Sequence, residues 1–196
     1  MDRRGFLRTV GLGAMVLENG LWVEAARTAA ADVLEVDVVS SYAPGLWFFD
    51  PPGLYVQLGQ TVRWSAGRWG PTVTAFHPAN DNRELRIPEG AKPFSSNEIG
   101  GERTPLKTRT FQWTFDVEGT YDYYSRNHEV LGLVGRIVVG KPGGPGEKPA
   151  GYGGREGRWP MYPKAAQLLE FLKSDQIVEK KTIPFPRQLF EHKFPG

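Results

Sequence analysis

The sequence predicts an all-β fold, an antiparallel β-sandwich followed by a C-terminal helix and an extended tail. Three observations support this fold class. Apolar and polar residues alternate over several short segments, glycine- and proline-containing turns separate these segments, and no long helical pattern interrupts them before residue 140. Short alternating strands with this spacing are typical of two packed antiparallel sheets.

The expected strands follow one another along the chain. In the first, Leu34, Val36 and Val38 alternate with acidic residues, as in a half-buried strand. Turn residues at 50–53 and 59–60 separate the next segments. The further strands are expected at 46–49, 54–58, 61–64, 72–76, 109–116, 120–124 and 134–139.

Composition limits the classes of function. The chain has 196 residues, of which 40% are hydrophobic, enough for the core of one domain with extensions. Its formal net charge of +2 is too small to indicate a nucleic-acid partner. The absence of cysteine excludes disulfides, thiolate catalysis and cysteine-ligated metals.

The N-terminal segment 1–31 resembles a twin-arginine export signal. Arg3 and Arg4 precede a mildly apolar stretch, and three alanines at 29–31 offer a cleavage site. Nine uncharged residues separate Arg8 from Glu18, fewer than the roughly 20 that span a bilayer. We therefore expect an exported, periplasmic protein. The alternative is an uncleaved basic leader that contacts the membrane surface.

A polar loop with His128 joins the last two expected strands. From about residue 33 to 140, the chain resembles the cupredoxins, in particular the plastocyanin and halocyanin group. The copper loop of that group has Cys, two residues, His, four residues and Met. Ser125, His128 and Leu133 stand at these positions here. The family's first His begins a strand of the form His-Thr-Val-Thr, and Pro71 takes its place.

This resemblance implies a Greek-key cupredoxin fold that has lost its copper centre. A blue-copper site needs two imidazoles, a thiolate and a weak axial thioether. Of the four ligand positions, only His128 keeps its donor, and we expect no cofactor. Ser125 lies three residues from His128 and has no surrounding nucleophile motif, so we expect no enzyme.

Cupredoxins dock on membrane-bound electron-transfer partners through the face around the exposed His. The resemblance therefore implies an exported structural or interaction subunit of an electron-transfer or photosynthetic complex, such as a reaction centre or light-harvesting assembly. Its partners would be protein subunits. The alternative is a periplasmic copper or zinc carrier with a non-blue site at His77, His128 and Glu129.

A long polar connection separates the expected strands at 72–76 and 109–116. Its mixed charges at Asp81, Arg83, Glu84 and Arg86 predict a solvated face, with contact to a partner as the alternative.

Four segments are predicted: the leader 1–31, the sandwich 32–140, a Gly/Pro-rich linker 141–162, and a helix with a tail at 163–196. The helix is expected from Pro163 to near Ser174. Residues 141–196 contain ten Lys or Arg and six Asp or Glu, a net charge of +4. The tail is predicted to bind a partner, or alternatively to fold back over the sandwich. Its candidate partner-binding residues are Lys180, Lys181, Phe185, Leu189, Phe190 and Phe194.

Overall fold

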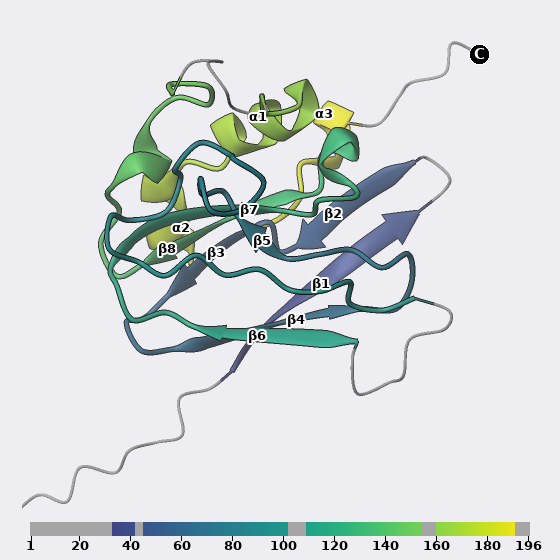
Figure 1. Cartoon of the computed structure of the whole chain (residues 1–196), viewed down its shortest axis with the longest axis horizontal. Coiled ribbons are helices and arrows are strands. Elements are labelled where there is room, and N and C mark those ends of the chain that lie inside the picture. Colours follow the sequence, from purple (N-terminus) through teal and green to yellow (C-terminus); the bar gives the residue numbers. More distant parts are fainter. Residues whose placement is uncertain (1–32, 42–44, 102–108, 154–159, 191–196) are drawn as a thin grey trace, which may run out of the picture. The chain divides into compact units, whose positions relative to one another are not determined.

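The computed structural model describes residues 33–41, 45–101, 109–153 and 160–190. In these residues the chain forms a two-sheet β-sandwich with short C-terminal helices (Figure 1). The predicted leader at 1–31 lies outside the described residues. No helix in the described part of the chain is long and apolar enough to cross a membrane.

The strands divide between a four-stranded sheet and a five-stranded sheet. The first has the order β2-β1-β4-β6 and the second β5-β7-β8-β3-β9. The strands are β1 (Leu34–Ser41), β2 (Leu46–Asp50), β3 (Gly53–Val56), β4 (Thr61–Ala66), β5 (Thr74–Ala75), β6 (Thr110–Thr114), β7 (Gly119–Tyr124), β8 (Val134–Val139) and β9 (Thr182–Ile183).

The predicted β-sandwich is confirmed, but both sheets are mixed and not purely antiparallel. β1 pairs with β4 in parallel, and β3 pairs with β8 in parallel. Between β1 and β4 the chain passes through β3 in the other sheet, so β4 returns in the same direction as β1. The alternation of apolar and polar residues within a strand shows which face is buried. It does not show which strand pairs with it or in which direction.

The strand predicted at 72–76 is reduced to the two residues of β5. The amides of Thr72 and Val73 donate to hydroxyl oxygens, Ser125 Oγ at 3.1 Å and Ser96 Oγ at 2.8 Å. These amides are thus bound by side chains from other segments and not by a neighbouring strand.

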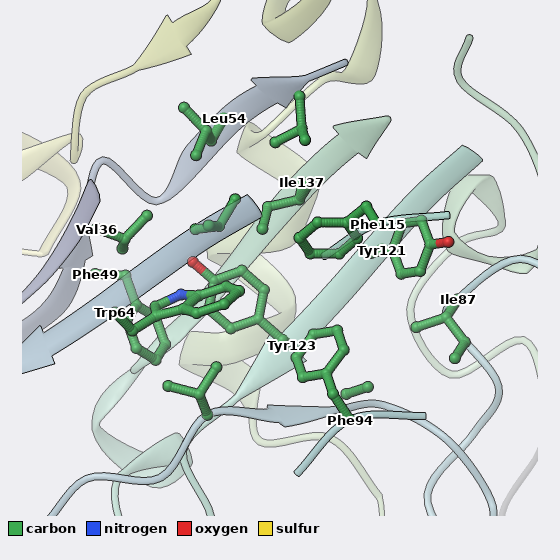
Figure 2. Packing of buried hydrophobic residues seen from close by; sticks show 14 of the residues in the cluster. Val36, Phe49, Leu54, Trp64, Ile87, Phe94, Phe115, Tyr121, Tyr123 and Ile137 are labelled. Atoms are coloured by element: carbon green, nitrogen blue, oxygen red, sulfur yellow. The ribbon is translucent and has the colours of Figure 1, made fainter. Parts of the chain in front are cut away.

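The main core lies between the two sheets and is rich in aromatic side chains. Figure 2 shows Trp64, Phe94, Phe115 and Tyr123 gathered in it. The ring centroids of the other three residues lie 5.5–6.4 Å from the centroid of Trp64. All four side chains are buried. Inward-facing residues of the expected strands therefore form much of the core, and Phe94 enters it from the connection between 76 and 109.

A second apolar cluster covers the outer face of the five-stranded sheet. Three helices contribute to this layer: α1 (Pro163–Phe171), α2 (Ser174–Lys180) and α3 (Arg187–Phe190). Figure 1 shows α1 over β7 and β8, on the side away from β4 and β6. The cluster consists of Phe76, Tyr124, Val134 and Val138 from the sandwich and Ala165, Leu168, Leu169, Leu172, Ile177 and Ile183 from the C-terminal segment.

The predicted helix at Pro163 is confirmed, but the tail after it is not extended. The chain leaves α1 at Leu172, whose ψ of 76° is not helical, and it re-enters a helix at Ser174. β9 then adds antiparallel to the edge of β3. In the described residues the tail folds back over the sandwich, the alternative that the sequence left open.

The prediction of a solvated face at 81–86 is wrong for Arg83, Glu84 and Arg86, which are buried. Arg86 donates from Nε to Asp122 at 2.7 Å and from Nη1 to Glu84 at 2.8 Å. Asp81 alone is exposed as expected. The pattern of charges shows that this segment is polar. Whether its charged side chains are buried depends on ion-pair partners from elsewhere in the chain, such as Asp122 for Arg86.

Arg86 and Arg136 also bind the predicted linker. Each donates from Nη2 to the carbonyl oxygen of Gly146 at 3.0 Å, and Gly146 is buried. The linker has too few apolar residues for a core of its own, as expected, but its carbonyls are ligands for two buried guanidinium groups.

Candidate functional site

The candidate site is the loop between β7 and β8, with the 3-10 helix η2 (Glu129–Leu131) at its centre. Three backbone hydrogen bonds define its shape. Ser125 N donates to Leu133 O at 3.0 Å, His128 N to Ser125 O at 3.1 Å, and Leu133 N to His128 O at 3.2 Å. The loop is therefore closed by its own backbone.

The structure brings the four predicted ligand positions into one region. Ser125 Oγ lies 3.3 Å from His128 Nδ1 and accepts from the amide of Thr72, the residue after Pro71. Leu133 is fully buried in the main core. Hydrogen bonds thus join Ser125, His128, the backbone of Leu133 and the residue after Pro71, while the side chains at the four positions differ from a copper donor set.

These side chains do not fit a type-1 copper ion. A hydroxyl is a hard, weak donor, and proline and leucine side chains offer none, so one imidazole remains where two imidazoles and a thiolate are needed. Ser125 is also fully buried and already hydrogen-bonded. Its hydroxyl is inaccessible to a substrate, which argues against a Ser125–His128 nucleophile pair.

The alternative metal site at His77, His128 and Glu129 is not formed. His77 Nδ1 accepts from the amide of Ala79 at 3.0 Å. Glu129 Oε1 instead accepts from Arg83 Nη2 and from the amide of Tyr162. Throughout the described ranges, no three His, Cys, Asp or Glu side chains are grouped so that they could hold a metal ion.

Burial sets the protonation of the histidines. It lowers the pKa of His128, although the negative charge of Glu98 acts in the opposite direction. Burial also lowers the pKa of His77. Both imidazoles are therefore neutral near pH 7.

Two tryptophans at the site were not identified from the sequence. The ring of Trp47 stacks on His128, with centroids 4.6 Å apart and an interplanar angle of 10°. Trp47 also meets Trp69 edge-on at 6.0 Å. The alternation in β2 indicated a strand, but no spacing signal linked Trp47 to a loop more than 70 residues later.

Large apolar side chains are exposed around this loop. The exposed fraction is 40% for Trp69, 50% for Val130, 36% for Leu131 and 44% for Tyr162. Trp69 reaches the loop through Trp47, and the backbone of Tyr162 is bonded to Glu129. We call Trp69, Val130, Leu131 and Tyr162 the apolar face. Exposed large apolar side chains around one loop make it a candidate interaction site.

A charged pocket of about 320 Å³ opens beside the loop. Two ion pairs line it. Asp81 accepts from Arg126 Nε at 2.6 Å and from the Tyr124 hydroxyl at 2.8 Å, and Glu129 pairs with Arg83. Burial raises the pKa of Glu129, whereas the charge of Arg83 and the Tyr162 amide act to lower it.

The structure does not gather the predicted partner-binding residues of the tail into one surface. Phe185 stacks on Phe48 at 4.1 Å, and Phe190 packs against Phe185 at 5.1 Å. Lys181 Nζ lies 3.7 Å from the Tyr55 ring centroid. Lys180 and Leu189 are exposed, and Phe194 lies outside the described residues. In this structure, the two described phenylalanines contact the chain's own sandwich.

No protein-family model matches the chain. It is 29% identical to halocyanin of Natronomonas pharaonis over 105 residues, which are 54% of this chain and 56% of halocyanin. It is 28% identical to plastocyanin of Prochlorothrix hollandica over 137 residues, which are 65% of this chain and 88% of that protein. The chain thus spans just over half the length of this halocyanin.

Solved structures of pseudoazurins are also similar. The pseudoazurin of Sinorhizobium meliloti has a TM-score of 0.48 and 25% identity, covering 72% of this chain and 96% of that one. The pseudoazurin of Hyphomicrobium denitrificans has a TM-score of 0.45 and 20% identity, and the match covers 57% of this chain and 77% of that one. The chain is thus similar in sequence to halocyanin and plastocyanin, and its two-sheet β-sandwich is a cupredoxin-like fold.

Proposed function

We propose that this chain is a copper-free interaction subunit that binds a protein of an electron-transfer complex through the apolar face around His128. The observation that carries the proposal is a closed loop that has the family's spacing but lacks a copper donor set. The similarity to plastocyanin and halocyanin, and with it the resemblance to the cupredoxins, supports a role related to electron transfer. A role in docking needs the loop and the surface around it, not the metal.

The apolar face supports binding to a protein surface. Val130 and Leu131 lie in η2, and Trp69 joins them through Trp47 and His128. These side chains are exposed to water in the described chain. A partner that buried them would gain binding free energy from the apolar surface removed from water. Hydrogen bonds and buried Leu133 hold the loop beneath them.

Export and membrane association belong to the same proposal. The twin-arginine-like segment 1–31 and the similarity to halocyanin and plastocyanin support an exported, periplasmic protein. The partner complex would then be membrane-bound, as in electron-transfer or photosynthetic assemblies, and the N-terminus would contact the membrane surface. Exposed Lys180 and Leu189 of the tail offer a second contact to such a complex.

The proposal is tested by capture from the native membrane fraction with the tagged full-length chain. The double variant Val130→Glu, Leu131→Glu places two charges in the apolar face. The matched control is Leu58→Glu, because Leu58 is 55% exposed and its turn bonds to Phe115, near the opposite end of β7 from Ser125. Captured haem or chlorophyll proteins are identified by mass spectrometry and by their absorption.

We expect redox proteins with the wild-type chain and with Leu58→Glu, and their loss with the double variant. Two charges in a desolvated interface should reduce binding by at least about tenfold. If the double variant retains the same redox proteins, the face does not bind them. If no redox protein is enriched by the wild type, the proposed function is wrong.

A further inference from the structure

Trp47 joins parts of the molecule that are far apart in the sequence. It lies in β2, an edge strand of the four-stranded sheet, whereas His128 follows β7 of the five-stranded sheet. Its indole stacks on His128 at 4.6 Å and meets Trp69 at 6.0 Å with an angle of 68°. One partly buried side chain therefore contacts both loops that carry the apolar face.

The two loops are also tied to each other by hydrogen bonds. Asn127 Nδ2 donates to Gly70 O at 3.2 Å and to Glu98 Oε1 at 2.8 Å. Arg126 N donates to Thr72 Oγ1 at 2.8 Å. Trp69 has a left-handed backbone conformation, with φ of 71°, which is unfavourable for a residue other than glycine, so contacts from outside the turn help to hold it.

Of these contacts, the stack with Trp47 fixes the orientation of the His128 ring. The hydrogen bond to Ser125 at 3.3 Å holds one atom, Nδ1, and would permit rotation about that point. A parallel ring at 4.6 Å fixes the plane. We infer that Trp47 is a positioning residue that holds His128 and Trp69 in one arrangement without a metal ion. This deepens the proposed function, because it identifies what keeps the apolar face in place.

The inference is tested on the full chain by NMR, with Trp47→Leu, Trp47→Phe and the control Trp113→Leu. Trp113 is a matched control, because it is also partly buried and lies in β6, the other edge strand of the same sheet. The indole ring current should shift the His128 ring protons upfield in the wild type. Amide exchange at His128 and Leu133, whose amides donate hydrogen bonds within the loop, reports how firmly the loop is closed.

We expect Trp47→Leu to abolish the upfield shift and to speed this amide exchange by about tenfold, as the loss of one aromatic contact implies. Trp47→Phe should restore most of both values, because it keeps a ring against His128. Trp113→Leu should change neither. If Trp47→Leu acted only through a general loss of packing, Trp113→Leu would change the His128 shifts and the amide exchange equally. Trp47→Phe would then not restore these values selectively.

Unchanged His128 shifts and exchange in folded Trp47→Leu would overturn the inference. If Trp47→Leu does not fold, His128→Ala tests the same stack from its other side, and an unmoved Trp47 indole signal would contradict it. Capture of the redox partner separates the two proposals. If the loop loosens in Trp47→Leu and the double variant Val130→Glu, Leu131→Glu retains the redox proteins, Trp47 is a positioning residue and the proposed docking through this face is wrong.

Discussion

Arg86 donates from Nε to Asp122 Oδ2 at 2.7 Å, and neither side chain is more than 2% exposed. Asp122 also accepts from Arg136, at 2.7 Å to Oδ1. Both arginines bind the carbonyl of Gly146, and Arg136 binds that of Leu172 at 2.8 Å. This buried cluster therefore connects β7, β8, the connection at 81–86 and the C-terminal segment.

We expect Arg86→Met to lower the free energy of unfolding by about 3–5 kcal/mol, because it leaves buried acceptors without their charged donor. Arg63→Met is the control. Arg63 pairs with Glu35 at 2.8 Å, but both side chains are exposed by 37% or more, so the loss should be at most about 1 kcal/mol. Urea unfolding measures both. Equal losses in the two variants would show that the buried cluster adds no special stability.

The C-terminal segment should be part of the folding unit. Leu168 is fully buried on the outer face of the five-stranded sheet, whereas Leu189 is 48% exposed. We expect Leu168→Ala to cost about 2–5 kcal/mol and Leu189→Ala less than about 0.5 kcal/mol. Truncation after Gly140 should abolish cooperative unfolding, because it uncovers Tyr124, Val134 and Val138. A truncated chain that unfolds cooperatively at the full-length temperature would contradict this.

The sequence predicted the sandwich because apolar residues alternate within each strand and mark its inward face. This alternation can be read from a few neighbouring residues. In β7, the alternate residues Tyr121 and Tyr123 lie in the main core. It could not show that the opposite face, with Asp122 and Tyr124, is covered as well. The helical spacing predicted α1. It did not predict the surface on which α1 packs, because that surface belongs to strands whose other face already lies in the main core.

Similar reasoning explains the partial success at the site. Ser125, His128 and Leu133 lie in one hydrogen-bonded loop, because spacing within a short loop limits where its residues lie. The burial of Arg83 and Arg86 depends on Glu129 and Asp122, which lie 46 and 36 residues away. The contact between Trp47 and His128 is of the same long-range kind. Only the folded chain brings such residues together.

The Asp81–Arg126 pair predicts how stability changes in acid. Burial acts to raise the pKa of Asp81, but the hydrogen bonds from Arg126 and Tyr124 outweigh it and lower this pKa below 3.8. A lowered carboxylate pKa stabilises the fold above the unfolded-state pKa of about 3.9, and this contribution is lost as pH falls through the folded-state value. We expect Asp81→Asn to be less stable than the wild type at neutral pH by at most about 1 kcal/mol, since the pair is partly exposed.

This difference should vanish once the pH is well below the folded-state pKa of Asp81, where the wild-type carboxyl is protonated too. Denaturant unfolding of both proteins across this range measures it. A difference that stays constant with pH would show that the asparagine changes packing and not charge.

Copper titration tests whether the site is a former metal centre. With Pro71, Ser125 and Leu133 at three ligand positions, we expect Cu(II) to produce no intense thiolate-to-copper absorption with the wild-type chain. The triple variant Pro71→His, Ser125→Cys, Leu133→Met supplies the missing donors at positions that the fold already brings together. We expect a blue, stoichiometric copper complex from the triple variant and none from any single variant, because the trigonal plane needs both the second imidazole and the thiolate. The matched control, Pro71→His with Leu133→Met, restores every donor except the thiolate and should remain colourless. A triple variant that folds but binds no copper would show that Pro71 does not stand at the first ligand position, and a blue wild-type protein would overturn the copper-free assignment itself.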